Sequence, residues 1–153
     1  MENIKSKKIA LITGATSGIG EATAKKLANK FSLILCGRRQ EKLTTLSKSL
    51  SNLTTIKTLT FDVRDKDDVS TKLNELEGEW KNIDILINNA GIFTPAAPID
   101  EIEVNDWLES VNVNLTGSFL CARAAFKKMR AQSPMGGRII KNGSISAHVI
   151  GPH

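Results

Sequence analysis

The stretch whose residue types and spacing most clearly suggest a chemical function is Thr13–Gly20, of sequence TGATSGIG. It follows the apolar run Ile9–Ile12 and opens into a segment typical of a helix, Glu21–Asn29. The first backbone N–H groups of a helix lack intrahelical partners and carry the positive end of its dipole, so such a turn can hold a phosphate. Glycines suit the turn because it needs unusual dihedral angles and because a Cβ would keep a pyrophosphate away from the backbone. The pattern therefore predicts a dinucleotide pyrophosphate site.

Two arginines follow the next apolar run, at a place that decides the type of dinucleotide. Arg38 lies eighteen positions after Gly20. In NAD-binding sheets this place holds an acid for the ribose 2′-hydroxyl, whereas an arginine can pair with the 2′-phosphate of NADP. Arg38 and Arg39 are both available, and no acidic residue precedes Glu41. The sequence thus favours NADP over NAD, the alternative being a solvated helix start.

Apolar runs and helical patterns alternate along the chain. Strands are expected at Ile9–Ile12, Phe31–Cys36, Ile56–Val63, Ile83–Ile87 and Arg138–Ser146. The longest helix is expected at Glu103–Arg130, with an apolar stripe of Trp107, Val111, Leu115, Ala122, Phe126 and Met129. Short strands alternating with longer helices indicate a parallel sheet covered on both faces by right-handed crossovers. Ligands on such sheets bind beyond the carboxyl ends of the strands, where each motif falls.

Length and composition predict one domain, residues 1–153, because 41% hydrophobic and 24% charged residues are ordinary values for a soluble protein. No apolar run approaches the roughly 20 residues of a membrane span, and the N-terminus lacks the apolar core of a signal peptide, which predicts a cytoplasmic protein without a membrane partner. The net charge of +5 does not predict nucleic-acid binding, because the basic residues are scattered among acids. Cys36 and Cys121 are expected to be buried free thiols, and no metal site is predicted.

Three segments carry a resemblance to the short-chain dehydrogenase/reductase family, in its classical subgroup. TGATSGIG at Thr13–Gly20 resembles the family's cofactor fingerprint. Asn-Asn-Ala-Gly at Asn88–Gly91 resembles its second signature, in which an amide ties adjacent strands together and small residues leave room for the ribose and nicotinamide. Asn114, in Asn-Leu-Thr-Gly, matches the asparagine that bends a helix locally and holds a water in a proton relay.

The resemblance implies a three-layer, Rossmann-type, doubly wound parallel α/β sheet of about five strands in the order 3-2-1-4-5. It further implies alcohol/ketone interconversion of a small molecule by hydride transfer with NADP, and a homo-oligomer for the full-length protein. Asp62 and Val63 would contact the adenine ring. Asn114 and Ser146 would be catalytic; Ser146, or alternatively Ser144, would bind the substrate oxygen. The expected cofactor-binding residues are Thr13, Gly14, Ser17, Gly18, Ile19, Gly20, Arg38, Arg39, Asp62, Val63, Asn88, Ala90 and Gly91.

The chain departs from the family in the acid/base motif Tyr-x-x-x-Lys. It contains no tyrosine and stops at His153, seven residues after Ser146. Hydride transfer needs a proton partner, so we expect an N-terminal portion, incomplete relative to the family, with little or no dehydrogenase activity. The long helix would then lack the following helix against which the family packs it, leaving apolar side chains partly bare. The alternative is a non-catalytic NAD(P)-binding sensor; a nucleotide-sugar epimerase is disfavoured, because its usual Gly-x-x-Gly-x-x-Gly spacing is missing.

Overall fold

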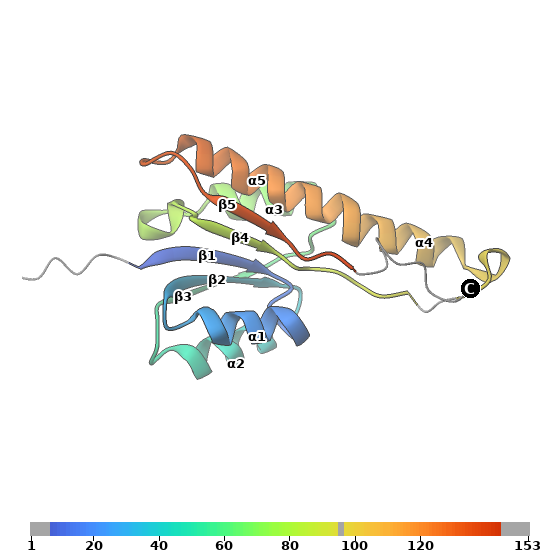
Figure 1. The fold of residues 1–153 in the computed structure, drawn as a ribbon, viewed down its shortest axis with the longest axis horizontal. Coiled ribbons are helices and arrows are strands. Elements are labelled where there is room, and N and C mark those ends of the chain that lie inside the picture. Colours follow the sequence, from blue (N-terminus) through green and yellow to red (C-terminus); the bar gives the residue numbers. More distant parts are fainter. Residues whose placement is uncertain (1–6, 95–96, 145–153) are drawn as a thin grey trace, which may run out of the picture.

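The computed structural model of the protein describes residues 7–94 and 97–144. Its strands are β1 (Lys8–Thr13), β2 (Phe31–Gly37), β3 (Ile56–Thr60), β4 (Ile85–Asn88) and β5 (Arg138–Lys141) (Figure 1). Its α-helices are α1 (Gly18–Leu27), α2 (Gln40–Leu50), α3 (Lys66–Asn74), α4 (Val104–Val111) and α5 (Ser118–Ala131). Two 3-10 turns, η1 (Gly78–Lys81) and η2 (Ile99–Glu101), and a π-helical segment, η3 (Asn112–Gly117), complete the described elements.

The five strands form one parallel sheet in the order β3-β2-β1-β4-β5, which confirms the predicted topology. Figure 1 shows α1 and α2 on one face of this sheet and α3 and α5 on the other. Successive side chains of a strand point to opposite faces, so a central strand covered on both sides must be apolar throughout. Leu11 and Ile12 of β1 fit this rule, since each is fully buried in a different one of the two cores.

The element boundaries differ from the expected ones by a few residues. The third strand ends at Thr60 instead of Val63, because the chain turns at Asp62, whose carbonyl accepts a hydrogen bond from the Asp65 N–H. The first helix begins three residues early, at Gly18. The described part of the last strand ends at Lys141. These shifts place Asp62 in a loop after β3, whereas Thr13 and Asn88 become the last residues of β1 and β4.

The long helix is continuous from α4 through η3 to α5, and the expected apolar stripe lies mostly at the surface: of its six members only Met129 is buried. The face turned to the sheet carries Val113, Cys121 and Met129, whereas Trp107 and Leu115 are about 60% exposed. The helix α4, in which no residue is buried, projects beyond the sheet (Figure 1), so the first part of the stripe is uncovered.

The two cysteines are free and buried, as predicted. Cys36 lies in β2 and Cys121 in α5, within the same core. Burial raises the pKa of the Cys121 thiol to about 12, and it also raises that of Cys36 well above its ordinary value. Both thiols are therefore protonated at neutral pH and act as small apolar side chains. Among the described helices, none has the length and apolar character needed to cross a membrane.

Candidate dinucleotide site

A cavity of about 880 Å³ opens at the carboxyl ends of β1, β2 and β4. This volume lies within the range of small-molecule sites. Ten of the predicted cofactor-binding residues line it: Gly14, Ser17, Gly18, Ile19, Arg38, Arg39, Asp62, Val63, Ala90 and Gly91. The parallel sheet brings them together because its strands end at the same edge, although they are up to 77 positions apart in the sequence.

The glycine-rich turn forms one wall of the cavity. Gly14 has φ +66°, a left-handed conformation that favours glycine. A Cβ on Gly20 would lie 2.2 Å from the Gly14 carbonyl oxygen, so Gly20 does not line the cavity but lets α1 pack closely on the turn. The N-cap residue of α1, Ser17, makes no side-chain capping hydrogen bond. The first N–H groups of α1 are therefore available to an anion in the cavity.

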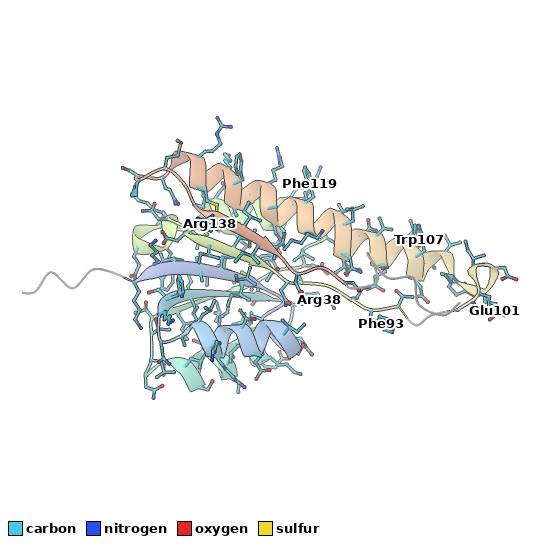
Figure 2. All side chains as sticks on the ribbon, viewed as in Figure 1. Arg38, Phe93, Glu101, Trp107, Phe119 and Arg138 are labelled. Atoms are coloured by element: carbon cyan, nitrogen blue, oxygen red, sulfur yellow. The ribbon has the colours of Figure 1, made fainter. Side chains whose placement is uncertain are left out.

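The two arginines that follow β2 have different surroundings. Arg39 Nη2 donates hydrogen bonds to Thr16 Oγ1 (2.7 Å) and Ser17 Oγ (3.0 Å), which fastens its guanidinium to the glycine-rich turn. Arg38 extends at the carboxyl end of the sheet (Figure 2), and its Nη1 lies 3.9 Å from Asp62 Oδ2. With 56% of its side chain exposed, Arg38 can meet a further anionic group.

Asp62 forms the opposite wall of the cavity, where β3 has ended. Both of its carboxylate oxygens accept hydrogen bonds from Arg64, which is not among the residues predicted from the sequence. The hydrogen bonds from the Arg64 side chain lower the pKa of Asp62; partial burial opposes them, and the charge of Arg38 adds to them. In the sequence, the contact between Arg64 and Asp62 is indicated only by the position of a basic residue two places after an acidic residue at the end of a strand.

Thr13 and Asn88, the last residues of β1 and β4, hold the loop that lines the cavity. Thr13 is fully buried, and its Oγ1 accepts hydrogen bonds from the N–H groups of Asn89 and Ala90, both at 3.0 Å. Asn88 Nδ2 donates to the Ser118 carbonyl at 2.7 Å and so joins β4 to α5. Neither Thr13 nor Asn88 lines the cavity, and their hydrogen bonds hold the loop that does.

Asn114 lies inside the π-helical segment η3, at the local distortion that the resemblance implied. Its Oδ1 accepts a hydrogen bond from the Ile92 N–H (2.9 Å), and its Nδ2 donates to the Ile92 carbonyl (3.0 Å) and to Ser110 Oγ (3.2 Å). The side chain thus fastens the loop after β4 to the long helix. The Asn114 carbonyl accepts from Lys141 Nζ at 3.4 Å, which accounts for a lysine at the end of β5.

Of the two candidate serines, Ser144 is exposed and lies three residues past the end of β5, whereas Ser146 lies outside the described residues. Further lining residues were not predicted, among them Thr16, Asn89, Phe93 and Asn142. Thr16 and Asn89 stand inside the two glycine-containing motifs and could have been included. Asn142 had no signal, because only the fold brings its Nδ2 to within 3.0 Å of Asn89 Oδ1.

Comparisons with known proteins agree on one family. The short chain dehydrogenase family matches residues 8–153. The chain is 35% identical over 139 residues to sulfoacetaldehyde reductase 2 of Chromohalobacter salexigens, covering 90% of this chain and 55% of the relative. It is 36% identical to the NADP-dependent 3-hydroxy acid dehydrogenase YdfG of Shigella flexneri, covering 89% of this chain and 54% of the relative.

Solved structures agree with these relatives. A gluconate 5-dehydrogenase from Burkholderia cenocepacia, in complex with NADP and tartrate, superposes with a TM-score of 0.87 at 34% identity. The match covers 97% of this chain and 58% of that structure. The chain therefore spans a little more than half the length of the proteins it matches. Sheet order, cavity position and sequence match agree, and this chain belongs to the short-chain dehydrogenase/reductase family of oxidoreductases.

Proposed function

We propose that residues 1–153 form the cofactor-binding domain of an NADP-dependent oxidoreductase that interconverts an alcohol and a ketone on a small-molecule substrate. The observation that carries the proposal is the cavity in which the uncapped start of α1 meets Arg38 and Arg39. Partial positive charge from a helix start and two guanidinium groups are together suited to a pyrophosphate and a further phosphate. One similar protein is named an NADP-dependent dehydrogenase and another was solved in complex with NADP, and both support this choice of cofactor.

The residues present fit the parts of such a cofactor. The N–H groups at Ser17–Ile19 would hold the pyrophosphate, and Arg38 would pair with the 2′-phosphate. Asp62 and Val63 would contact the adenine ring, and Ala90 and Gly91 would leave room for the nicotinamide ribose. When bound, NADP supplies the hydride donor or acceptor, and the chain's residues bind and orient it.

The catalytic roles are proposals that follow the family pattern. Asn114 would help to hold a water in a proton relay, and Ser146, or alternatively Ser144, would donate a hydrogen bond to the substrate oxygen. The 153 residues contain no tyrosine, the residue that the family uses as acid/base. We therefore propose that this chain alone binds the cofactor in the cytoplasm without turning substrate over. A non-catalytic NADP sensor would bind in the same way, and an assay of the full-length protein with alcohols and ketones would separate the two.

Exchanging Arg38 for alanine tests the cofactor assignment. We expect R38A to weaken NADPH binding by about 10- to 100-fold, the effect of losing a charge-assisted hydrogen bond to phosphate. NADH binding should stay within about twofold, because NADH lacks the 2′-phosphate. Isothermal titration calorimetry of both cofactors gives the comparison.

R39A is the matched control for this experiment. Arg39 holds Thr16 and Ser17, so its loss should weaken both cofactors alike by disturbing the turn. An equal loss of NADPH and NADH affinity in R38A, or a wild-type preference for NADH, would contradict the NADP assignment.

We also propose that the protein is a homo-oligomer joined through the long helix. Figure 2 shows Trp107 and Phe119 along its outer side. An exposed or half-exposed apolar row follows helical spacing from α4 to α5: Val104, Leu108, Val111, Leu115, Phe119, Ala122 and Phe126. The row is symmetric about Leu115, as a two-fold antiparallel contact requires. Such pairing would set Val104 opposite Phe126 of the second copy and Glu103 opposite Lys127.

Placing a glutamate at Leu115 tests this contact. Leu115 of two copies would meet at the two-fold axis, so L115E would place two negative charges together in an apolar contact. We expect the dimer dissociation constant to rise at least about 100-fold, as the loss of two buried leucine side chains implies. Sedimentation velocity across a concentration series measures it. Leu53, which is 39% exposed in the turn after α2, offers the control L53E. A monomeric wild type, or an L115E dimer of unchanged affinity, would refute the contact.

A further inference from the structure

We propose that Arg64 is a positioning residue for adenine recognition: it fixes the Asp62 carboxylate so that one acceptor site faces the 6-amino group of the adenine. The inference rests on the proposed function, because Asp62 can meet adenine only if the cavity holds the dinucleotide. Arg64 does not itself line the cavity, so it acts through Asp62.

The contact between Arg64 and Asp62 is a fork. Arg64 Nη2 lies 2.7 Å from Asp62 Oδ2, and Nε lies 3.1 Å from both Oδ1 and Oδ2. The backbone N–H of Arg64 donates to Oδ1 at 3.0 Å. A planar guanidinium matches the plane of a carboxylate and fixes its rotation, which a single donor does not achieve.

The fork leaves acceptor capacity for a ligand. A carboxylate offers about four acceptor sites. Arg64 makes four contacts with only three N–H groups, because the single proton on Nε is shared between Oδ1 and Oδ2. The carboxylate therefore meets fewer donors from Arg64 than it has acceptor sites, and Asp62 lines the cavity in which a further donor would lie. An ionised carboxylate accepts but does not donate, so it can pair with the amino group of adenine and not with the carbonyl of hypoxanthine.

The third nitrogen of the Arg64 guanidinium contacts the long helix. Arg64 Nη1 lies 3.3 Å from Oε1 of Glu109, which belongs to α4. No residue of α4 is buried, so this ion pair is one of the links between that helix and the rest of the domain. The Arg64 guanidinium is thus held on two sides, by Asp62 and by Glu109, and it cannot rotate without breaking one of these contacts.

A solvent-exposed ion pair usually contributes little to stability, and that is the rival explanation for Arg64. The two explanations differ in what they predict for the ligand. A merely structural pair would affect every dinucleotide alike. A positioning role would affect only a ligand that carries the 6-amino group.

The test compares NADPH with its hypoxanthine analogue, in which a carbonyl replaces the 6-amino group. Calorimetric titration of the full chain with each ligand gives the ratio of their affinities. We expect wild type to prefer NADPH by about tenfold, which corresponds to one hydrogen bond to a charged group. In R64A this preference should disappear, through weaker NADPH binding with the analogue nearly unchanged. R64K, which keeps the charge without the fork, should lose part of the preference.

E109A provides a second variant in case R64A folds poorly. It frees one end of Arg64 and should reduce the preference by about two- to threefold, a fraction of the tenfold preference expected for the hydrogen bond. D106A removes an acid from the same helix that has no ion pair among the described residues, and should leave the preference unchanged. Equal loss of both ligands in R64A, unchanged binding in R64A, or a wild type that does not distinguish the ligands would each overturn the inference. A wild type that binds neither ligand would instead refute the proposed function.

Discussion

Gly20→Ala is expected to abolish measurable NADPH binding and to lower the free energy of unfolding by about 1–3 kcal/mol, the usual cost of overpacking. The added Cβ would lie 2.2 Å from the Gly14 carbonyl oxygen and 2.6 Å from Asn89 Nδ2. Alanine inside a helix gains about 1 kcal/mol over glycine, which favours the variant. That gain is too small to offset the clash. The Cβ meets the backbone carbonyl of Gly14, a residue held at φ +66°, and this backbone cannot easily move away.

Stability and NADPH binding should be lost together in this variant. The turn that must move to admit the Cβ is the one that lines the cavity. Calorimetry with NADPH and urea unfolding measure the two effects. Gly78→Ala is the matched control, since Gly78 also has a positive φ but has open space around it and lies far from the cavity. It should lose about 1–2 kcal/mol of stability from backbone strain and none of the affinity. Unchanged NADPH affinity in G20A would contradict the proposed role of the turn.

Thr13→Val is expected to destabilise the protein by about 2–4 kcal/mol, because two N–H groups lose their acceptor and each orphaned donor costs about 1–3 kcal/mol. Valine matches threonine in shape, so the fully buried site stays filled and only the hydroxyl is lost. That hydroxyl accepts from the N–H groups of Asn89 and Ala90 and donates to Asn88 Oδ1 at 3.4 Å.

Thr13→Ser separates the hydroxyl from the methyl group. It keeps the hydrogen bonds and should lose about 1 kcal/mol for one buried methyl. Urea unfolding of the three proteins supplies the free energies, and the denaturant slope should not change between them. A valine variant as stable as the serine variant would show that the hydroxyl does not hold the loop after β4.

The topology and most of the cavity lining were predictable because they follow from local signals. The apolar run Ile9–Ile12, the glycines after it and the helical pattern beyond define a strand, a turn and a helix without reference to the rest of the chain. The polar motifs at Arg38, Asp62 and Asn89 each follow a strand. A parallel sheet brings such residues together at one edge, so the site follows from the sheet order.

The remaining features depend on contacts between distant segments. Arg64 matters because its guanidinium reaches both Asp62 and Glu109, and no local pattern announces a pair 45 residues apart. The stripe expected on the long helix lies mostly at the surface, because the face that packs on the sheet carries Val113, Cys121 and Met129, and periodicity alone does not show which face a sheet covers. Thr13, Gly20 and Asn88 do not line the cavity, and their contacts hold the turn and the loop after β4. Their expected role toward the cofactor stays a prediction.

A titration of the 153-residue chain with NADPH, followed by two-dimensional 1H-15N NMR spectroscopy, addresses the central claim most directly. The claim is that the backbone amides at the start of α1 hold the pyrophosphate and that Arg38 lies beside the adenosine phosphate. It predicts the largest chemical-shift changes at the amides of Gly14 and Ser17–Gly20, with further changes at Arg38, Asp62 and Ala90. Absence of saturable shifts, or shifts confined to the outer faces of α3 and α5, would contradict it.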